Sequence, residues 1–118
     1  MKVNDFIKWA EEMQFQENKI MLDKGKEYTV SDDDKFKNFK SIGDRLGLEA
    51  EKIALVYLLK HMDSIRNYVL NGTESSDESI MGRIHDARNY LLLLGGIIKE
   101  NDLQKVKPYV SVELLGTE

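Results

Sequence analysis

The sequence has no cysteine, a single proline and a single tryptophan, and its formal net charge is −4 at pH 7. The absence of cysteine excludes disulfide bonds, thiolate catalysis and zinc sites built on sulfur. The acidic balance leaves no broad basic surface for a nucleic-acid backbone, which argues against a general role in DNA binding.

Long apolar runs and the common catalytic motifs are missing as well. The most apolar stretch, residues 90–98, is far shorter than the roughly 20 residues that a membrane-spanning helix needs. The first ten residues mix charged with apolar side chains, so no signal peptide is visible. No Gly-rich phosphate loop, H-E-x-x-H or G-x-S-x-G pattern occurs. We therefore expect a cytoplasmic protein without a serine nucleophile, and no catalytic residue is assigned.

The 118 residues, 42% apolar and 32% charged, suit one soluble domain, residues 1–118, with a modest core. Apolar side chains recur at helical spacing in four segments, which predicts helices over residues 3–24, 31–46, 49–70 and 78–99. The expected stop signals are Gly25, Gly47, Asn71-Gly72 and Asn101-Asp102. Ser75 and Glu78 have the spacing of a capping box at the start of the last helix.

These segments predict an all-α fold, a four-helix bundle-like single domain with a short C-terminal tail over residues 103–118. The tail contains Pro108 and a partly alternating YVSVELL stretch, and it is expected as an edge strand, a strap or a frayed end. Residues 90–98 are apolar on all sides, so we expect a homo-oligomer in which a second copy covers part of this helix.

Both of the long helices carry stripes of interest. In the third helix the predicted core stripe is Leu55, Leu58, Leu59, Met62, Ile65 and Val69, and the more polar stripe is Ala54, Tyr57, His61, Ser64 and Tyr68. In the fourth helix Gly82 and Gly96 share a stripe with Asp86 and Asn89. Glycines on one helix face indicate either close packing against another backbone or room for a ligand, and both remain open.

Candidate binding residues lie near the middles of these two helices. Lys60, His61 and Ser64 on one, with Asn89 and Tyr90 on the other, suit recognition of a phosphate or a base. Tyr28 and Asn38 flank the linker between the first two helices and are candidates for cradling a base, although aromatics there also suit a core.

Three carboxylates are candidate metal ligands. Asp63, Glu78 and Asp86 suit an Mg²⁺ ion that keeps several waters and meets substrate phosphates. The simpler alternative is a cluster of surface ion pairs around Lys60 and Asp63.

Three strings carry a resemblance to a known family: EYTVSDDDKFKNFK, LGLEAEKIALVYLLKHMDSI and ESIMGRIHDARNYLLLL. They resemble small phage-borne helical proteins related to nucleotide-modification-associated domains and, more remotely, the MazG-like all-α nucleoside-triphosphate pyrophosphohydrolases. The family-like residues are Asp34, Phe36, Asn38, Phe39, Lys60, His61, Asp63, Ile65, Glu78, Asp86, Asn89 and Tyr90. The MazG-like enzymes hold Mg²⁺ with E-x-x-E and E-x-x-D motifs. Here E-x-x-E is absent, and the single E-x-x-D, Glu74 to Asp77, lies in a polar loop.

The resemblance implies nucleotide handling more strongly than hydrolysis. The first hypothesis is a binding protein for a small nucleotide or nucleotide-derived signal, which it would sequester in a phage anti-defence role. The second is an Mg²⁺-dependent, MazG-like pyrophosphohydrolase, so whether the chain is an enzyme stays open. The third is a protein-interaction or inhibitor module that uses the apolar last helix and the tail.

Overall fold

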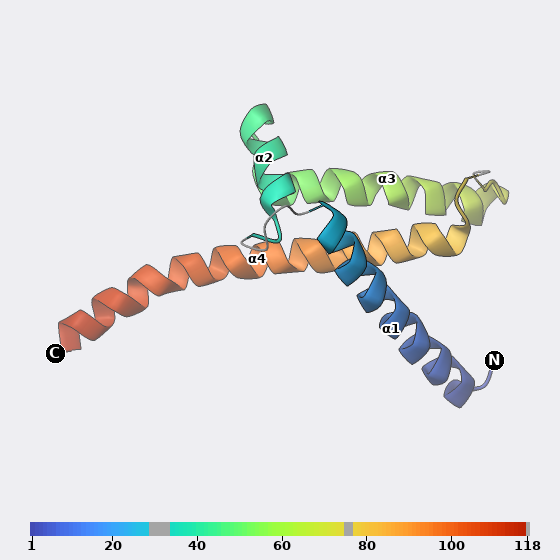
Figure 1. Ribbon diagram of the computed structural model, residues 1–118, viewed down its shortest axis with the longest axis horizontal. Coiled ribbons are helices and arrows are strands. Elements are labelled where there is room, and N and C mark those ends of the chain that lie inside the picture. The colour runs from blue at the N-terminus through green and yellow to red at the C-terminus, as the bar shows by residue number, and fades with distance from the viewer. Residues whose placement is uncertain (29–33, 75–76, 118) are drawn as a thin grey trace. The chain divides into compact units, whose positions relative to one another are not determined.

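Figure 1 shows the computed structural model, which describes the backbone of residues 1–28, 34–74 and 77–117 and the side chains of residues 1–21, 34–74 and 77–105. The described residues form four helices and no strand: α1 (Val3–Tyr28), α2 (Lys37–Leu46), α3 (Ala50–Asn71) and α4 (Ile80–Thr117). The predicted all-α class and the number of helices are therefore confirmed. None of the described helices is both long and apolar enough to cross a membrane.

The chain divides into two compact units, Met1–Lys35 and Phe36–Glu118. The first unit contains α1, whose helix continues through Gly25 to Tyr28, so the predicted stop at Gly25 is wrong. One glycine costs a helix only about 1 kcal/mol, which a helix of this length absorbs. Within α1 the rings of Phe6 and Trp9 pair at a centroid distance of 5.9 Å.

Glycines end α2 and α3 where the sequence predicts. Gly47 and Gly72 have φ values of 69° and 68°, the left-handed conformation that glycine adopts without a steric penalty. The N–H of Leu48 donates to the carbonyl of Gly43 at 2.9 Å, and the N–H of Gly72 donates to the carbonyl of Tyr68 at 2.8 Å. Helix α2 begins at Lys37, later than predicted, and residues 31–33 of the predicted start lie outside the described residues.

The start of α4 is capped by side chains that precede it. Ser79 Oγ accepts a hydrogen bond from the N–H of Gly82 at 3.0 Å, and Glu74 Oε1 accepts one from the N–H of Ile80 at 2.7 Å. The helix therefore begins two residues after the predicted start at Glu78, and Ser75 of the predicted capping box lies outside the described residues.

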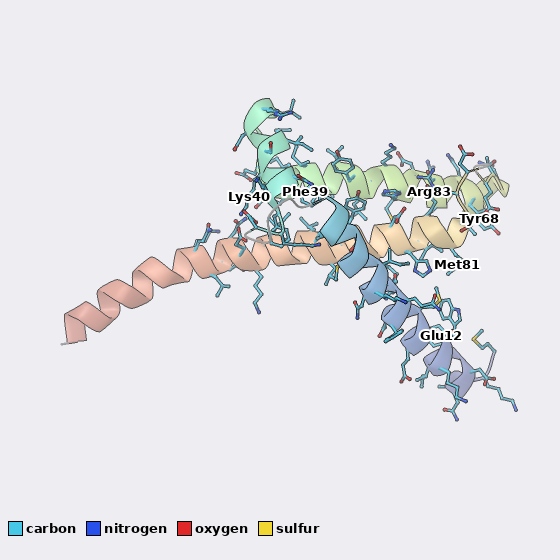
Figure 2. The ribbon with its side chains drawn as sticks, in the orientation of Figure 1. Glu12, Phe39, Lys40, Tyr68, Met81 and Arg83 are labelled. Carbon is cyan, nitrogen blue, oxygen red and sulfur yellow. The ribbon has the colours of Figure 1, made fainter. Side chains whose placement is uncertain are left out.

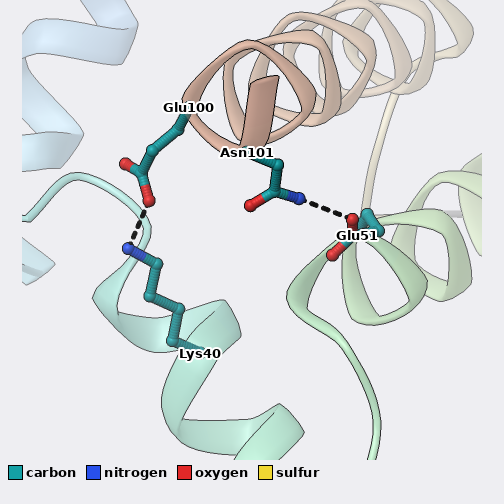
Figure 3. Close-up of polar contacts among 4 residues, drawn as sticks. All are labelled: Lys40, Glu51, Glu100 and Asn101. Carbon is teal, nitrogen blue, oxygen red and sulfur yellow. Dashed lines mark hydrogen bonds and ion pairs between the residues drawn. The ribbon is translucent and has the colours of Figure 1, made fainter. Parts of the chain in front are cut away.

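The end of α4 also differs from the prediction. The helix passes Asn101-Asp102 and Pro108 and ends at Thr117. The edge strand, one of the three alternatives for residues 103–118, is therefore not formed. Asn101 is held in the helix by its own contact, because its Nδ2 donates to Glu51 Oε2 of α3 at 2.7 Å (Figure 3).

In the second unit α3 and α4 run antiparallel side by side, and α2 packs against α3 (Figure 1). The buried core consists of Ile53, Ala54, Leu58, Ala87 and Ile97. The helix face of α3 that meets α4 is the one predicted as the more polar stripe. Of the predicted core stripe Leu58 is buried, whereas Leu55, Leu59, Met62 and Val69 are exposed, so that prediction is largely wrong.

Two side chains at and just before the start of α2 reach α4, one through a ring and one through an ion pair. A Cβ added to Gly96 would lie 2.7 Å from Cζ of Phe36, so this glycine makes room for the Phe36 ring. Beside it Lys40 Nζ lies 2.6 Å from Glu100 Oε1 (Figure 3). The space predicted at Gly96 for a helix or a ligand is therefore filled by an aromatic side chain of the same unit.

Candidate functional site

The ring of Tyr90 lies at the centre of an aromatic cluster formed by Phe39, Tyr57, His61 and Tyr90. Tyr57 stacks on it at a centroid distance of 5.5 Å and an interplanar angle of 7°, and His61 stacks at 5.2 Å and 21°. Phe39 of α2 contributes an edge-on contact at 6.3 Å. Two of the predicted binding residues, His61 of α3 and Tyr90 of α4, therefore meet in this cluster.

The rings of the aromatic cluster pack against one another. Each stacked pair contributes about 0.5–1.5 kcal/mol beyond the area it buries, so the cluster stabilises the contact of α2, α3 and α4. Because Tyr57 and His61 both stack on Tyr90, the Tyr90 ring is used for packing in the described structure.

Among the described residues, Nδ1 of His61 is buried without a hydrogen-bond partner. An unpaired buried polar atom of this kind costs about 1–3 kcal/mol, so a group that paired with it would be favoured.

A second concave feature lies at the end of the hairpin, where the chain turns from α3 to α4. It is a cavity of about 200 Å³, here named the turn cavity. Tyr68 and Arg83 lie on facing helices at this end of the hairpin (Figure 2). The cavity is lined by Ser64, Asn67, Tyr68, Thr73, Glu74, Glu78, Ile80 and Arg83.

Arg83 is the cationic group of the turn cavity. Its Nε lies 2.9 Å from Glu78 Oε2, which is the distance of an ion pair. The same Nε is buried and makes no aligned hydrogen bond with a described residue, so the contact with Glu78 is electrostatic and poorly directed. A guanidinium has five N–H donors, so Arg83 can contact Glu78 and an anionic ligand group together.

The other lining groups suit a polar ligand with a flat ring. Ser64 and Thr73 supply hydroxyls, Asn67 supplies an amide, and Tyr68 supplies an aromatic ring and a phenol. Glu74 also lines the cavity, but its Oε1 accepts the first N–H of α4.

The structure separates the predicted binding residues. His61 and Tyr90 meet in the aromatic cluster, and Ser64 lines the turn cavity. Lys60 and Asn38 are exposed, whereas Asn89 is half-buried in α4 next to Tyr90. The side chain of Tyr28 lies outside the described residues.

The predicted metal ligands are not brought together. Within the described side chains, no group of three or more His, Cys, Asp or Glu residues is placed to hold a metal ion. Asp63 is exposed, Glu78 pairs with Arg83, and Asp86 is half-buried on α4. The reason is that the face of α3 carrying Asp63 is not the face that meets α4.

Sequence reasoning missed Arg83, Asn67 and Thr73. The sequence contained a usable signal, the short loop after Asn71-Gly72. A short loop between two helices produces an antiparallel hairpin, so the last turns of the first helix face the first turns of the second. Polar residues within three turns of that point, such as Asn67 and Arg83, are therefore brought together by the hairpin itself.

Comparisons with models of protein families, with curated proteins and with solved structures found no match to this chain.

Proposed function

We propose that the protein binds a small nucleotide or nucleotide-derived signal in the turn cavity. The observation that carries the proposal is Arg83, a guanidinium with a buried Nε in the wall of a cavity that also presents hydroxyl, amide and aromatic groups. A guanidinium is well suited to phosphate, and a phenol ring beside an amide is well suited to a base.

The size of the turn cavity restricts the ligand. Sites that enclose a drug-sized molecule usually measure about 300–1,000 Å³, and this one measures about 200 Å³. We therefore assign it a single nucleotide unit or one end of a larger signal, with the rest of the molecule in solvent. Sequestration of a defence signal in a phage setting is part of the proposal and is supported by the sequence resemblance alone.

Two contacts of this proposal differ from the sequence-based assignment. Arg83 takes the phosphate-binding role first given to Lys60 and His61, because Lys60 is exposed and His61 stacks on Tyr90. Tyr68 and Asn67 take the role first given to Tyr90 and Asn89, because they line the cavity.

The test is calorimetric titration with nucleoside monophosphates and triphosphates, cyclic dinucleotides and ADP-ribose derivatives, each with and without EDTA. Binding that survives EDTA and leaves the ligand intact supports the proposal. The Arg83→Gln variant should lose most of this binding, whereas Arg45→Gln, which removes an exposed arginine of α2, should keep it. If no member of the panel binds, the proposal is wrong.

A protein-interaction module is the second candidate. The observation that favours it is the exposed apolar side of α3, which includes Leu59 and Val69. Pull-down from a lysate with the wild-type chain and with Leu59→Glu tests it, since a partner that uses this side should be captured by the wild type alone.

A further inference from the structure

The wall of the turn cavity carries more negative than positive charge. Its charged side chains are Glu74, Glu78 and Arg83. Arg83 matches Glu78, because its Nε lies 2.9 Å from Glu78 Oε2. Glu74 differs from Glu78: within the described part of the chain its one polar contact is with a backbone N–H. The carboxylate of Glu74 is therefore the charged group of the wall that a ligand can still satisfy.

The start of α4 holds the Glu74 carboxylate in place. Its Oε1 accepts the hydrogen bond from the N–H of Ile80 at 2.7 Å. The positive end of the helix dipole stabilises a negative charge at this point, so the group is favoured there as a fixed acceptor. A carboxylate has about four acceptor positions and no donor, so about three positions remain for N–H groups of a ligand.

Glu74 suits the base of a nucleotide rather than its phosphate. A phosphate would be repelled by the carboxylate, and it has a better partner in Arg83, about one helical turn from Ile80 along α4. Tyr68 and Asn67 line the same cavity and supply an aromatic face and an amide for a base. A nucleotide with its phosphate at Arg83 therefore presents the edge of its base to Glu74.

We propose that Glu74 selects guanine, so that the ligand of the turn cavity is a guanine nucleotide; this inference rests on the proposed function. Guanine carries two adjacent donors, N1–H and the N2 amino group, which match the oxygens of one carboxylate. Adenine and cytosine have an unprotonated ring nitrogen beside the amino group, and uracil has its N–H between two carbonyl groups. These acceptors would face the carboxylate and repel it.

The first test compares GMP, IMP and AMP by calorimetric titration of the wild-type chain, since the three share one phosphate and one ribose. GMP should bind about tenfold or more tightly than AMP. IMP keeps N1–H but lacks the amino group, so its affinity should lie between the two. Equal affinities, or tighter binding of AMP, overturn the selection of guanine and leave the proposed function standing. If no nucleotide binds, both the selection and the proposed function are wrong.

The second test assigns the selection to Glu74. Glu74→Gln keeps an oxygen for the N–H of Ile80 but replaces the other acceptor with an NH₂ donor. GMP should bind about tenfold more weakly to this variant, whereas AMP should bind as before, so the preference disappears.

Glu49→Gln is the matched control, because Glu49 is an exposed glutamate that precedes α3 at the end of the hairpin remote from the turn cavity. It should keep the preference for GMP. Circular dichroism checks that both variants stay helical, and the comparison of the three nucleotides on the wild type does not depend on either variant. A preference for GMP that persists in Glu74→Gln would overturn the assignment to Glu74.

Discussion

The imidazole of His61 on α3 stacks on the phenol ring of Tyr90 on α4, with 5.2 Å between the ring centroids and 21° between the ring planes. Tyr57 and Phe39 also contact the Tyr90 ring, so this one side chain joins α2, α3 and α4. On the side of α3 that meets α4, the flat rings of Tyr57 and His61 lie against Tyr90 and fill the space between the helices.

Tyr90 should therefore be among the residues on which stability depends most. Tyr90→Ala removes the shared ring and should lower the free energy of unfolding by about 2–4 kcal/mol. Tyr90→Phe keeps the stacked ring and is the control, so it should cost much less. Urea denaturation followed by circular dichroism measures both. Equal losses for the two variants would mean that the hydroxyl, rather than the stacking, is what matters.

The neighbouring glycines of α4 provide a matched pair. A methyl group at Gly96 would meet the Phe36 ring, whereas one at Gly95 would meet no other side chain or backbone atom within 4 Å. Gly95→Ala should stabilise the protein by up to about 1 kcal/mol through helix propensity, and Gly96→Ala should be about 1–3 kcal/mol less stable than Gly95→Ala because of overpacking. Thermal unfolding of the two variants decides the point, and identical midpoints would show that Phe36 does not occupy the space beside Gly96.

The cap of α4 holds one wall of the turn cavity. Ser79→Ala removes the acceptor for the N–H of Gly82 and should cost about 1 kcal/mol, whereas Ser79→Asn keeps an acceptor and should stay close to the wild type. Chemical denaturation measures the stability of both. Hydrogen exchange at the first amides of α4 should rise in the alanine variant alone, and unchanged exchange there would argue that another group caps the helix.

Replacing Glu78 tests more directly than replacing Arg83 whether the bound ligand is anionic. The Glu78 carboxylate lies 2.9 Å from Arg83 Nε, so its negative charge would repel an anionic ligand group bound to the same guanidinium. Glu78→Gln should therefore strengthen the binding of a phosphate-bearing ligand several-fold. Asp44→Asn, an exposed acid on α2, should leave it unchanged. Weaker binding to Glu78→Gln would indicate that the carboxylate holds the ligand directly.

Much of the fold follows from the sequence, because the signals that end α2 and α3 are local. Gly47 and Gly72 end their helices in the left-handed conformation that the position requires, and the antiparallel hairpin follows from the turn at Gly72. Gly25 and Asn101-Asp102 do not end helices, because a weak helix former inside a long helix costs little and contacts such as that of Asn101 offset it.

The side of α3 that packs on α4 could not be predicted from the periodicity of its apolar residues. Both of its stripes are long enough to form a core, and the choice depends on Phe39 and Tyr90, which reach it from other helices. For the same reason the candidate site was predicted in part. His61 and Tyr90, both predicted as binding residues, lie together in the aromatic cluster. Arg83 was missed because the sequence does not show where a hairpin leaves a cavity.

The most direct measurement for the proposed function is an NMR titration of the ¹⁵N-labelled chain with the tightest-binding nucleotide of the panel. The proposal predicts chemical-shift changes at the backbone N–H groups of Asn67, Thr73 and Arg83 and at the side-chain N–H groups of Asn67 and Arg83. In Arg83→Gln the changes at Asn67 and Thr73 should disappear. Shift changes confined to other parts of the chain, with the residues of the turn cavity unmoved, would contradict it.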